Sequence, residues 1–443
     1  MLSLNLRITL SLALLALPAC PTGEKVGENP TQSSDGSESS SGTTTAGPTT
    51  TEPTTTDGAD ATTTESSGST GPGEPGSTTI MGGGPPSECG PPCAETWTHV
   101  GDIDIDSALS TDEYACMTRV VGDIHIRNVD QQQLSGLRNL VSVEGILYIS
   151  PSDTLTDLSP FSCVEEAAEI LLSSLFALDD LSGLSALRRT ERFHMSGTAA
   201  TKVPSFSPEF SGLKEVTIGY HEALVDLAGM DNWKADESGV QVDIRYSPSL
   251  TSVAGLQPLL ASSPMPLTRI TLADLPALAS LAGLEGLTEL LALELRDLPL
   301  LKDLAPLGQL KTIGTLDLSG MPLVEDLQPL SQLETAERLT LGFCPADGAP
   351  DGVNGMDGIT SLAGLSALAT LGEFGAYDNE KLATLAGADN LTNITDGWAE
   401  LDNPALAPAT VAAFAAQVGQ DACSSSNPGC VCYIDDTVET GGV

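Results

Sequence analysis

The sequence predicts a mainly β protein: a β-solenoid of about 13 coils of about 23 residues, with short helical or irregular legs and a C-terminal capping helix. A short motif of two apolar residues around one other residue recurs from residue 103 onward, most often every 23 residues. Within each copy the apolar residues alternate with a period of two, which indicates a strand. Aromatic residues make up only 4% of the chain, so the core has to be built from repeated Leu, Ile, Val and Ala.

The first 19 residues are expected to be a signal peptide. One basic residue, Arg7, precedes an apolar run over residues 8–17 that is too short to span a bilayer. The text "LPAC" that ends at Cys20 resembles the lipobox of bacterial lipoproteins, with a proline at its second position. The resemblance implies a lipid anchor on Cys20 and, because Pro21 and not Asp follows it, an outer-membrane lipoprotein exposed at the cell surface. An ordinary signal peptide with an incidental Cys is the alternative.

Residues 20–88 are predicted to be a disordered tether rich in Ser, Thr, Gly and Pro. A stretch such as "SSSGTTTAGPTTTEPTTT" contains no aliphatic residue larger than Ala, so it cannot bury enough apolar surface to offset the entropy of ordering its backbone. A flexible coil of this length separates its ends by on the order of 45 Å. The segment would therefore hold the following domain away from a lipid surface.

The predicted solenoid covers residues 89–404. Each copy of the motif places two inward apolar residues on either side of one outward residue. At about 4.8 Å per strand, the copies would stack into a parallel sheet roughly 60 Å long. The first inward residues of the copies are Ile103, Ile124, Leu147, Ile170, Phe193, Val216, Val242, Ile270, Leu293, Leu316, Leu339, Phe374 and Ala399.

A small polar residue follows in many copies, eight residues after the second inward position. We expect each one to cap its turn by accepting a hydrogen bond from a backbone N–H group. Cation binding between neighbouring carboxylates is the alternative. The members are Asp157, Asp180, Asp226, Ser252, Ser280, Asp303, Asp326 and Thr384.

Two consecutive stretches carry a resemblance to a known family. The text "CMTRVVGDIHI" (116–126), followed by "LSGLRNLVSVEGILYI" (134–149), resembles the receptor L domain of insulin and epidermal-growth-factor receptors. Bacterial surface lipoproteins with degenerate repeats of this type are similar to the chain as a whole. The resemblance implies a right-handed, leucine-rich-repeat-like β-helix and no catalytic residues. The chain differs from one L domain in having more coils and no Cys-rich module.

Residues 405–443 are predicted to form a C-terminal helical, Cys-containing cap and tail, with a helix over 408–419. Besides Cys20, an even number of cysteines in an exported chain indicates disulfides. Cys163 and Cys344 are about seven coils apart and cannot pair with each other. We expect Cys116 to pair within the N-terminal cap and two of the last three cysteines to pair in the C-terminal cap; zinc is the alternative. The candidates are Cys89, Cys93, Cys116, Cys163, Cys344, Cys423, Cys430 and Cys432.

The charge balance excludes some classes of partner. With 18 basic and 60 acidic residues, the net charge of −42 argues against nucleic acid and against a basic patch on an anionic membrane. No sequence motif requires a cofactor. Glu294 and Asp317 occupy the same outward position in adjacent copies, about 5 Å apart, which resembles the spacing of a retaining glycosidase. Because Arg269, Arg296 and Arg338 lie on the same face, charge neutralisation is the preferred interpretation.

One long insertion raises the question of calcium. Between Leu339 and Phe374 the spacing grows to 35 residues, through a Gly-rich stretch with several oxygen-bearing side chains. Their spacing matches neither an EF-hand nor a nonapeptide calcium repeat, so no metal is predicted and a solvated loop is preferred. The weak candidates are Asp347, Asp351, Asn354 and Asp357.

The outward face of the predicted sheet is polar except where Ile146, Tyr148 and Leu171 meet, with His125 and His194 on either side. Apolar side chains gathered on a rigid sheet indicate a contact surface, unless a flanking loop covers them. We therefore expect a lipid-anchored surface protein that binds or adheres to a protein or glycan, and not an enzyme. A passive envelope lipoprotein and a polysaccharide-acting enzyme are the alternatives. Neither the partner nor the oligomeric state follows from the sequence.

Overall fold

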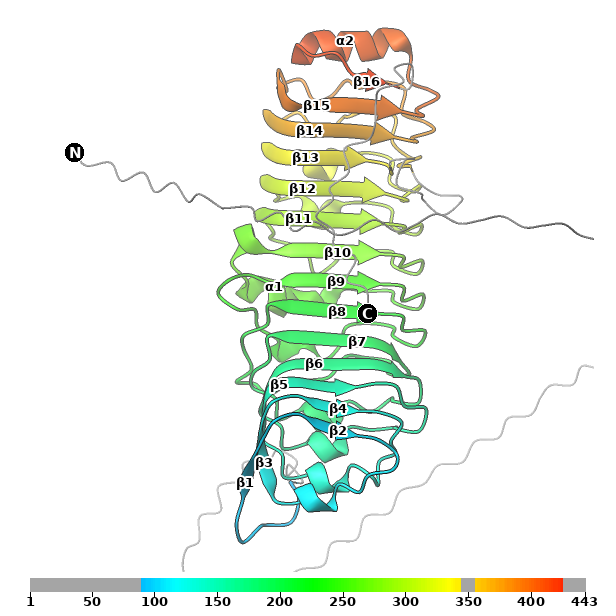
Figure 1. The fold of residues 1–443 in the computed structure, drawn as a ribbon. Helices are drawn as coiled ribbons and strands as arrows, with labels where there is room; N and C mark the ends of the chain where they lie inside the picture. Colours follow the sequence, from blue (N-terminus) through cyan, green and yellow to red (C-terminus); the bar gives the residue numbers. More distant parts are fainter. Residues whose placement is uncertain (1–88, 344–354, 425–443) are drawn as a thin grey trace, which may run out of the picture. The chain divides into compact units, whose positions relative to one another are not determined.

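The computed structural model describes residues 89–343 and 355–424. Within them the protein is mainly β, with a long parallel sheet and few helices, which agrees with a solenoid-like fold (Figure 1). The expected signal peptide, Cys20 and the expected tether lie outside the described residues. None of the helices in the described part is both long and apolar enough to cross a membrane.

The strands follow one another in the sheet almost in chain order, and every paired strand is parallel to its neighbour. The main path runs β1-β3-β5-β6 and then consecutively to β16, while β2 pairs with β4 and β4 pairs with β5. The strands are β1 (Trp97–Val100), β2 (Ile103–Ile105), β3 (Met117–Val121), β4 (Ile124–Ile126), β5 (Ser142–Ile149), β6 (Glu166–Leu175), β7 (Arg192–Thr198), β8 (Glu215–Gly219), β9 (Gln241–Arg245), β10 (Arg269–Ala273), β11 (Glu289–Arg296), β12 (Thr312–Ser319), β13 (Thr335–Leu341), β14 (Thr370–Tyr377), β15 (Ile394–Leu401) and β16 (Cys423–Ser424).

The legs between strands contain short helical turns, as expected for this fold class. Two α-helices are described, α1 (Gln257–Ser262) and α2 (Pro408–Val418). The single 3-10 turns are η1 (Asp112–Tyr114), η2 (Ser135–Leu137), η3 (Ser159–Phe161), η4 (Ser182–Leu184), η5 (Met230–Asn232), η6 (Ala254–Leu256), η7 (Met265–Leu267), η8 (Ala305–Leu307) and η9 (Gln328–Leu330).

The inward residues of the motif form the core along the sheet. Leu293, Leu316 and Leu339 are completely buried and lie opposite one another in β11, β12 and β13, as the repeat predicts. The legs supply the facing side of this core. Between β11 and β12, for example, a leucine at every third position is completely buried: Leu298, Leu301, Leu304, Leu307 and Leu310. Stacking identical leucines against both neighbouring repeats removes their apolar surface from water, which is the main stabilising term.

The register expected for the last copy is wrong by one residue. Trp398, not Ala399, lies opposite Phe374, and its side chain is only 1% exposed. A slip of one residue exchanges the two faces of a strand, so the larger apolar surface of the indole decides which residue points inward. Ala399 lies opposite Gly375 in the outward row, where it is buried together with Tyr377.

The two ends of the described body are closed differently. At the C-terminal end, α2 confirms the predicted helix, and its Phe414 packs edge-on against Trp398 with ring centroids 4.9 Å apart (Figure 1). At the N-terminal end, disulfides join Cys93 to Cys116 and Cys89 to Cys163. The first agrees with the expected pairing of Cys116 inside the cap; the partner of Cys163 was not predicted.

The polar residues of the turns make the hydrogen bonds expected of caps. Asp157 accepts a bond from the N–H of Ser159 at 2.8 Å, and Asp326 accepts one from Gln328 at 2.9 Å. Six further side chains accept the same bond from the backbone N–H two positions later: Asp180, Asp226, Ser252, Ser280, Asp303 and Thr384. These bonds satisfy the first free N–H group of each leg, so the turn interpretation is confirmed.

Candidate functional site

The outward side chains at the middle of the strands form one continuous row across the sheet. Each is paired in register with its equivalent in the next strand, so the row runs across the strands and along the length of the stack. All predicted contact residues except Ile146 belong to it; Ile146 pairs with Glu169 in the row beside it. From β2 to β12 the row consists of Asp104, His125, Tyr148, Leu171, His194, Thr217, Asp243, Thr271, Glu294 and Asp317.

A hollow of about 390 Å³ opens where this row crosses β5 to β8, and we call it the sheet-face pocket. Three of the five predicted contact residues line it, and His125 lies next to it with its ring 6.0 Å from that of Tyr148 at an angle of 87°. All five predicted residues are partly buried. The pocket is lined by Tyr148, Glu169, Leu171, Ser173, Arg192, Phe193, His194, Glu215 and Thr217.

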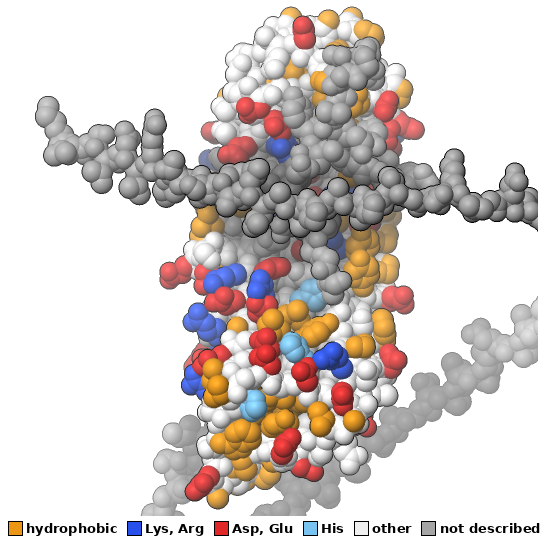
Figure 2. Space-filling view, viewed as in Figure 1, with side chains coloured by type: hydrophobic (Ala, Val, Ile, Leu, Met, Phe, Trp, Pro, Cys, Tyr) orange, Lys and Arg blue, Asp and Glu red, His pale blue; other side chains and the backbone are white. Residues whose placement is uncertain are grey.

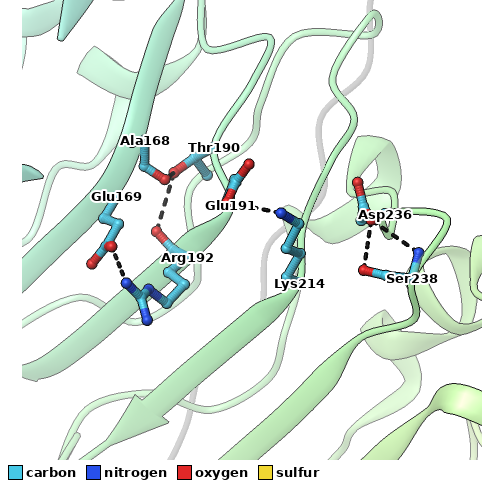
Figure 3. A network of polar contacts seen from close by, with 8 residues as sticks. All are labelled: Ala168, Glu169, Thr190, Glu191, Arg192, Lys214, Asp236 and Ser238. Atoms are coloured by element: carbon cyan, nitrogen blue, oxygen red, sulfur yellow. Dashed lines mark hydrogen bonds and ion pairs between the residues drawn. The ribbon is translucent and has the colours of Figure 1, made fainter. Parts of the chain in front are cut away.

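Paired charges border the apolar part of the pocket. Arg192 forms an ion pair with Glu169 on the neighbouring strand, and both line the pocket. A second pair, Lys214 with Glu191 at 2.9 Å, lies outside the lining, just before β8 and β7 (Figure 3). Figure 2 shows hydrophobic side chains between the histidines on this part of the face, with both signs of charge around them. The surface therefore combines an apolar centre with a polar rim, which is the usual composition of a protein interface.

The histidine in the pocket is suited to hydrogen bonding as a neutral ring. Burial lowers the pKa of His194, although Asp243 acts in the opposite direction. Its Nε2 atom lies 3.2 Å from the Oγ atom of Ser196, whose hydroxyl donates to Ser173. His125 instead lies 3.6 Å from Asp104, with which Arg127 also pairs. His125 and His194 are separated by two strands in the row, so they form no catalytic pair.

The possible carboxylate pair of the enzyme alternative is present in the sheet. Glu294 lies opposite Asp317 on adjacent strands, as expected. Glu294 is held in an ion pair with Arg296, and the hydroxyl of Thr271 donates to it at 3.4 Å. Arg338 forms an ion pair with Glu373. A carboxylate that is already paired with a guanidinium is a poor proton donor, so this geometry favours the charge-neutralising role.

Of the four weak calcium candidates, one lies within the described residues. Among the described residues, no group of three or more Cys, His, Asp or Glu side chains is placed to hold a metal ion. Asp347, Asp351 and Asn354 lie outside them; Asp357 lies inside, and its carboxylate accepts a bond from the N–H of Glu380 at 3.1 Å. Of the remaining cysteine candidates, Cys423 is disulfide-bonded, whereas Cys344, Cys430 and Cys432 lie outside the described residues.

Two features were not predicted from the sequence. His221 is completely buried, where its Nδ1 atom lies 3.4 Å from the backbone N–H of Thr198 and its Nε2 atom 3.0 Å from the carbonyl of Met195. A second pocket lies at the turns that follow β9 to β12. The signal for it was present as the recurring texts "YSP", "DLP", "DLP" and "GMP", each placing a proline two residues after the first residue of a turn.

No protein-family model matches this chain, and a search of curated proteins finds no match either.

Proposed function

We propose that the protein is a lipid-anchored surface protein that binds a partner protein through the sheet-face pocket. The observation that carries the proposal is the gathering of Tyr148, Leu171 and His194 around one hollow on an otherwise polar face. Tyrosine is favoured as an interface anchor because it buries a large ring while keeping a hydroxyl for hydrogen bonding. The ion pairs around the pocket would then form the rim that fixes orientation.

The finer features of the fold belong to the same proposal. We infer about 13 right-handed coils and membership of the receptor L-domain type, on the basis of the repeat spacing and the quoted motifs. We also infer that the chain is exported to the outer membrane and anchored there through Cys20. The disulfides of the N-terminal cap support an oxidising, extracytoplasmic location, since such bonds persist there and are rare in the cytosol. No cofactor and no nucleic acid enter the proposal.

The alternatives make different demands on the pocket. A passive envelope protein would not need an apolar hollow on its sheet, and a polysaccharide-acting enzyme would use Glu294 and Asp317, which lie at β11 and β12 away from it. A glycan partner is tested in the same experiment as a protein partner.

The proposal can be tested by photo-crosslinking in the cell of origin. A photoreactive phenylalanine analogue at position 148 should capture one defined protein, whereas the same analogue at Val225, which is 46% exposed outside the pocket, should not. The captured protein, once purified, should bind the full chain. Tyr148→Ala should weaken that binding by about 1–3 kcal/mol, because it removes the aromatic anchor.

The stability of Tyr148→Ala should stay close to that of the wild type, since Tyr148 is only partly buried. Equal capture from positions 148 and 225 would contradict the proposal, and so would unchanged affinity of Tyr148→Ala. Capture of a glycan instead of a protein would place the site correctly and refute the partner class. If the wild-type protein hydrolyses a glycan and Glu294→Gln does not, the result would favour the polysaccharide-acting enzyme.

A further inference from the structure

The second pocket is built by the turns that leave the strands. After β9, β10, β11 and β12 the chain turns through one residue with positive φ: Tyr246 (50°), Asp274 (55°), Asp297 (52°) and Gly320 (62°). The in-register pairing of these strands sets the four residues side by side along one edge of the sheet, where Figure 1 shows the turns stacked. Together with neighbouring prolines they line an open hollow of about 430 Å³, which we call the turn-edge pocket.

Most of the lining of this pocket is rigid and apolar. Pro248, Pro276 and Pro299 repeat along it, and Tyr246 forms one end. The ring of Tyr246 stacks on that of Tyr220 with centroids 4.7 Å apart and an interplanar angle of 21°. Tyr220 follows β8, whereas the pocket residues beyond Tyr246 and Pro248 follow β10 to β12, so the pocket lies on the other side of Tyr246. One aromatic face is thus held in place from behind and available in front.

Two carboxylates supply the polar groups. Among the described residues, no hydrogen bond or ion pair reaches the side chain of Asp274 or Asp297, and both are partly buried. Burial raises the pKa of each, and for Asp297 the neighbouring Asp274 raises it further, while Arg296 lowers both. Acceptors that are partly desolvated and without donors gain from a ligand that supplies donors.

Gly320 keeps the far end of the pocket open. A Cβ atom at this position would lie 2.4 Å from Oδ1 of Asp297, so any side chain would displace that carboxylate. The positive φ of Gly320 also suits glycine better than other residues. Glycine at position 320 therefore keeps this end of the pocket open and leaves room for the Asp297 carboxylate.

The charges around the pocket disfavour an anion, which would face Asp274 and Asp297 in a chain of net charge −42. Arg245 and Arg296 end the strands before two of these turns, but each already pairs with a carboxylate, Asp243 or Glu294, so a cation is the competing occupant. A neutral ligand rich in hydroxyl groups, with one apolar face, would use both the free carboxylate acceptors and the aromatic ring. A pyranose ring has these properties, since its C–H groups cover one face and its hydroxyls project from the edge.

We propose that the turn-edge pocket binds a neutral sugar ring of a glycan, with the ring packed on Tyr246 and two hydroxyls donating to Asp274 and Asp297. The pocket lies at a different edge and on different strands from the sheet-face pocket, so this inference does not depend on the proposed protein partner. The prolines would cover part of the sugar and so reduce the access of water to the sugar–carboxylate hydrogen bonds.

The test is isothermal titration of the full chain with cellohexaose, chitohexaose, maltohexaose and mannohexaose, each in the millimolar range. At least one should bind, and Tyr246→Ala should weaken it by about tenfold or more through loss of the aromatic platform. Asp274→Asn and Asp297→Asn should each weaken the same binding, because an amide is a weaker acceptor than a carboxylate. Tyr148→Ala, in the other pocket, should leave it unchanged.

Several results would overturn the inference: no heat with any of the four oligosaccharides, or full affinity in Tyr246→Ala. Binding of decaproline or of N-acetyl-trimethyllysine in place of the sugars would also refute it, and would identify a peptide or a cation as the occupant. Because Tyr246 is 43% exposed, Tyr246→Ala should fold; Asp274→Asn provides a second, smaller change at the same pocket. Loss of sugar binding in Tyr148→Ala alone would move the sugar site to the sheet face.

Discussion

Replacing Leu316 by alanine tests the inward register at the middle of the sheet. The Leu316 side chain is completely buried, and the residues opposite it on β11 and β13, Leu293 and Leu339, are completely buried as well. Removal of its methyl groups loses their transfer free energy and leaves a cavity that rigid neighbouring strands cannot fill. The free energy of unfolding should therefore fall by about 2–5 kcal/mol, the range for buried Leu→Ala changes. Leu316→Asp should cost more, because it also buries a carboxylate without a partner.

The assay is urea unfolding followed by circular dichroism, combined with hydrogen exchange read by mass spectrometry. In a repeat protein each repeat contacts mainly its neighbours, so protection should fall most in β11 to β13 and least in β5 and β6. Thr312 is the matched control, since it lies exposed at the start of the same strand. Thr312→Ala and Thr312→Asp should each change stability by only about 0.5 kcal/mol or less. An unchanged urea midpoint for Leu316→Ala, or equal effects at positions 316 and 312, would refute the register.

Two further predictions concern pH and the turns. Burial lowers the pKa of His221 below its usual value of 6.5. As the pH falls, the imidazole is therefore protonated in the unfolded chain before it is protonated in the folded chain. The stability that comes from the neutral imidazole is present above about pH 6.5 and is lost below it. Between about pH 8 and pH 5, the free energy of unfolding measured in urea should fall less in His221→Gln than in the wild type. His125→Gln is the control, and an equal fall in His221→Gln and the wild type would count against this role of His221. Asp326→Ala should lower the unfolding free energy by about 0.5–2 kcal/mol, because the N–H of Gln328 loses its acceptor. Asp326→Asn keeps an acceptor oxygen, so a loss as large as that of Ala would show that the charge and not the cap matters.

The repeat could be predicted because burial imposes it on the residue types. Each inward position must be apolar to pack on both neighbours, so Leu293, Leu316 and Leu339 are visible in the text as well as in the structure. At the last copy, "WAEL" allows two registers, and only the packing of Trp398 against Phe414 distinguishes them.

The pockets differ in how far the sequence could predict them. Tyr148, Leu171 and His194 meet because they share one position of the repeat, so strand register alone brings them together. The turn-edge pocket depends on backbone conformation instead. Its four positive-φ positions are occupied by Tyr, Asp, Asp and Gly, so only the proline two residues later repeats in the sequence. The bond between Cys89 and Cys163 was equally hidden, since it spans 74 residues and depends on the path of the N-terminal cap.

The Cys89–Cys163 disulfide decides how the protein would respond to a pulling force. If the segment before residue 89 is a tether and a partner is bound to the sheet, tension entering at Cys89 passes through the covalent bond to Cys163, just before β6. The chain between the two cysteines, including β1 to β5, is then bypassed and cannot be peeled away strand by strand from the end. The load instead reaches the sheet next to Tyr148 and Leu171, where a partner on the sheet-face pocket would take it up directly. The disulfide would thus carry the force from the anchor to the binding surface, and the strands of the N-terminal cap would not be under load.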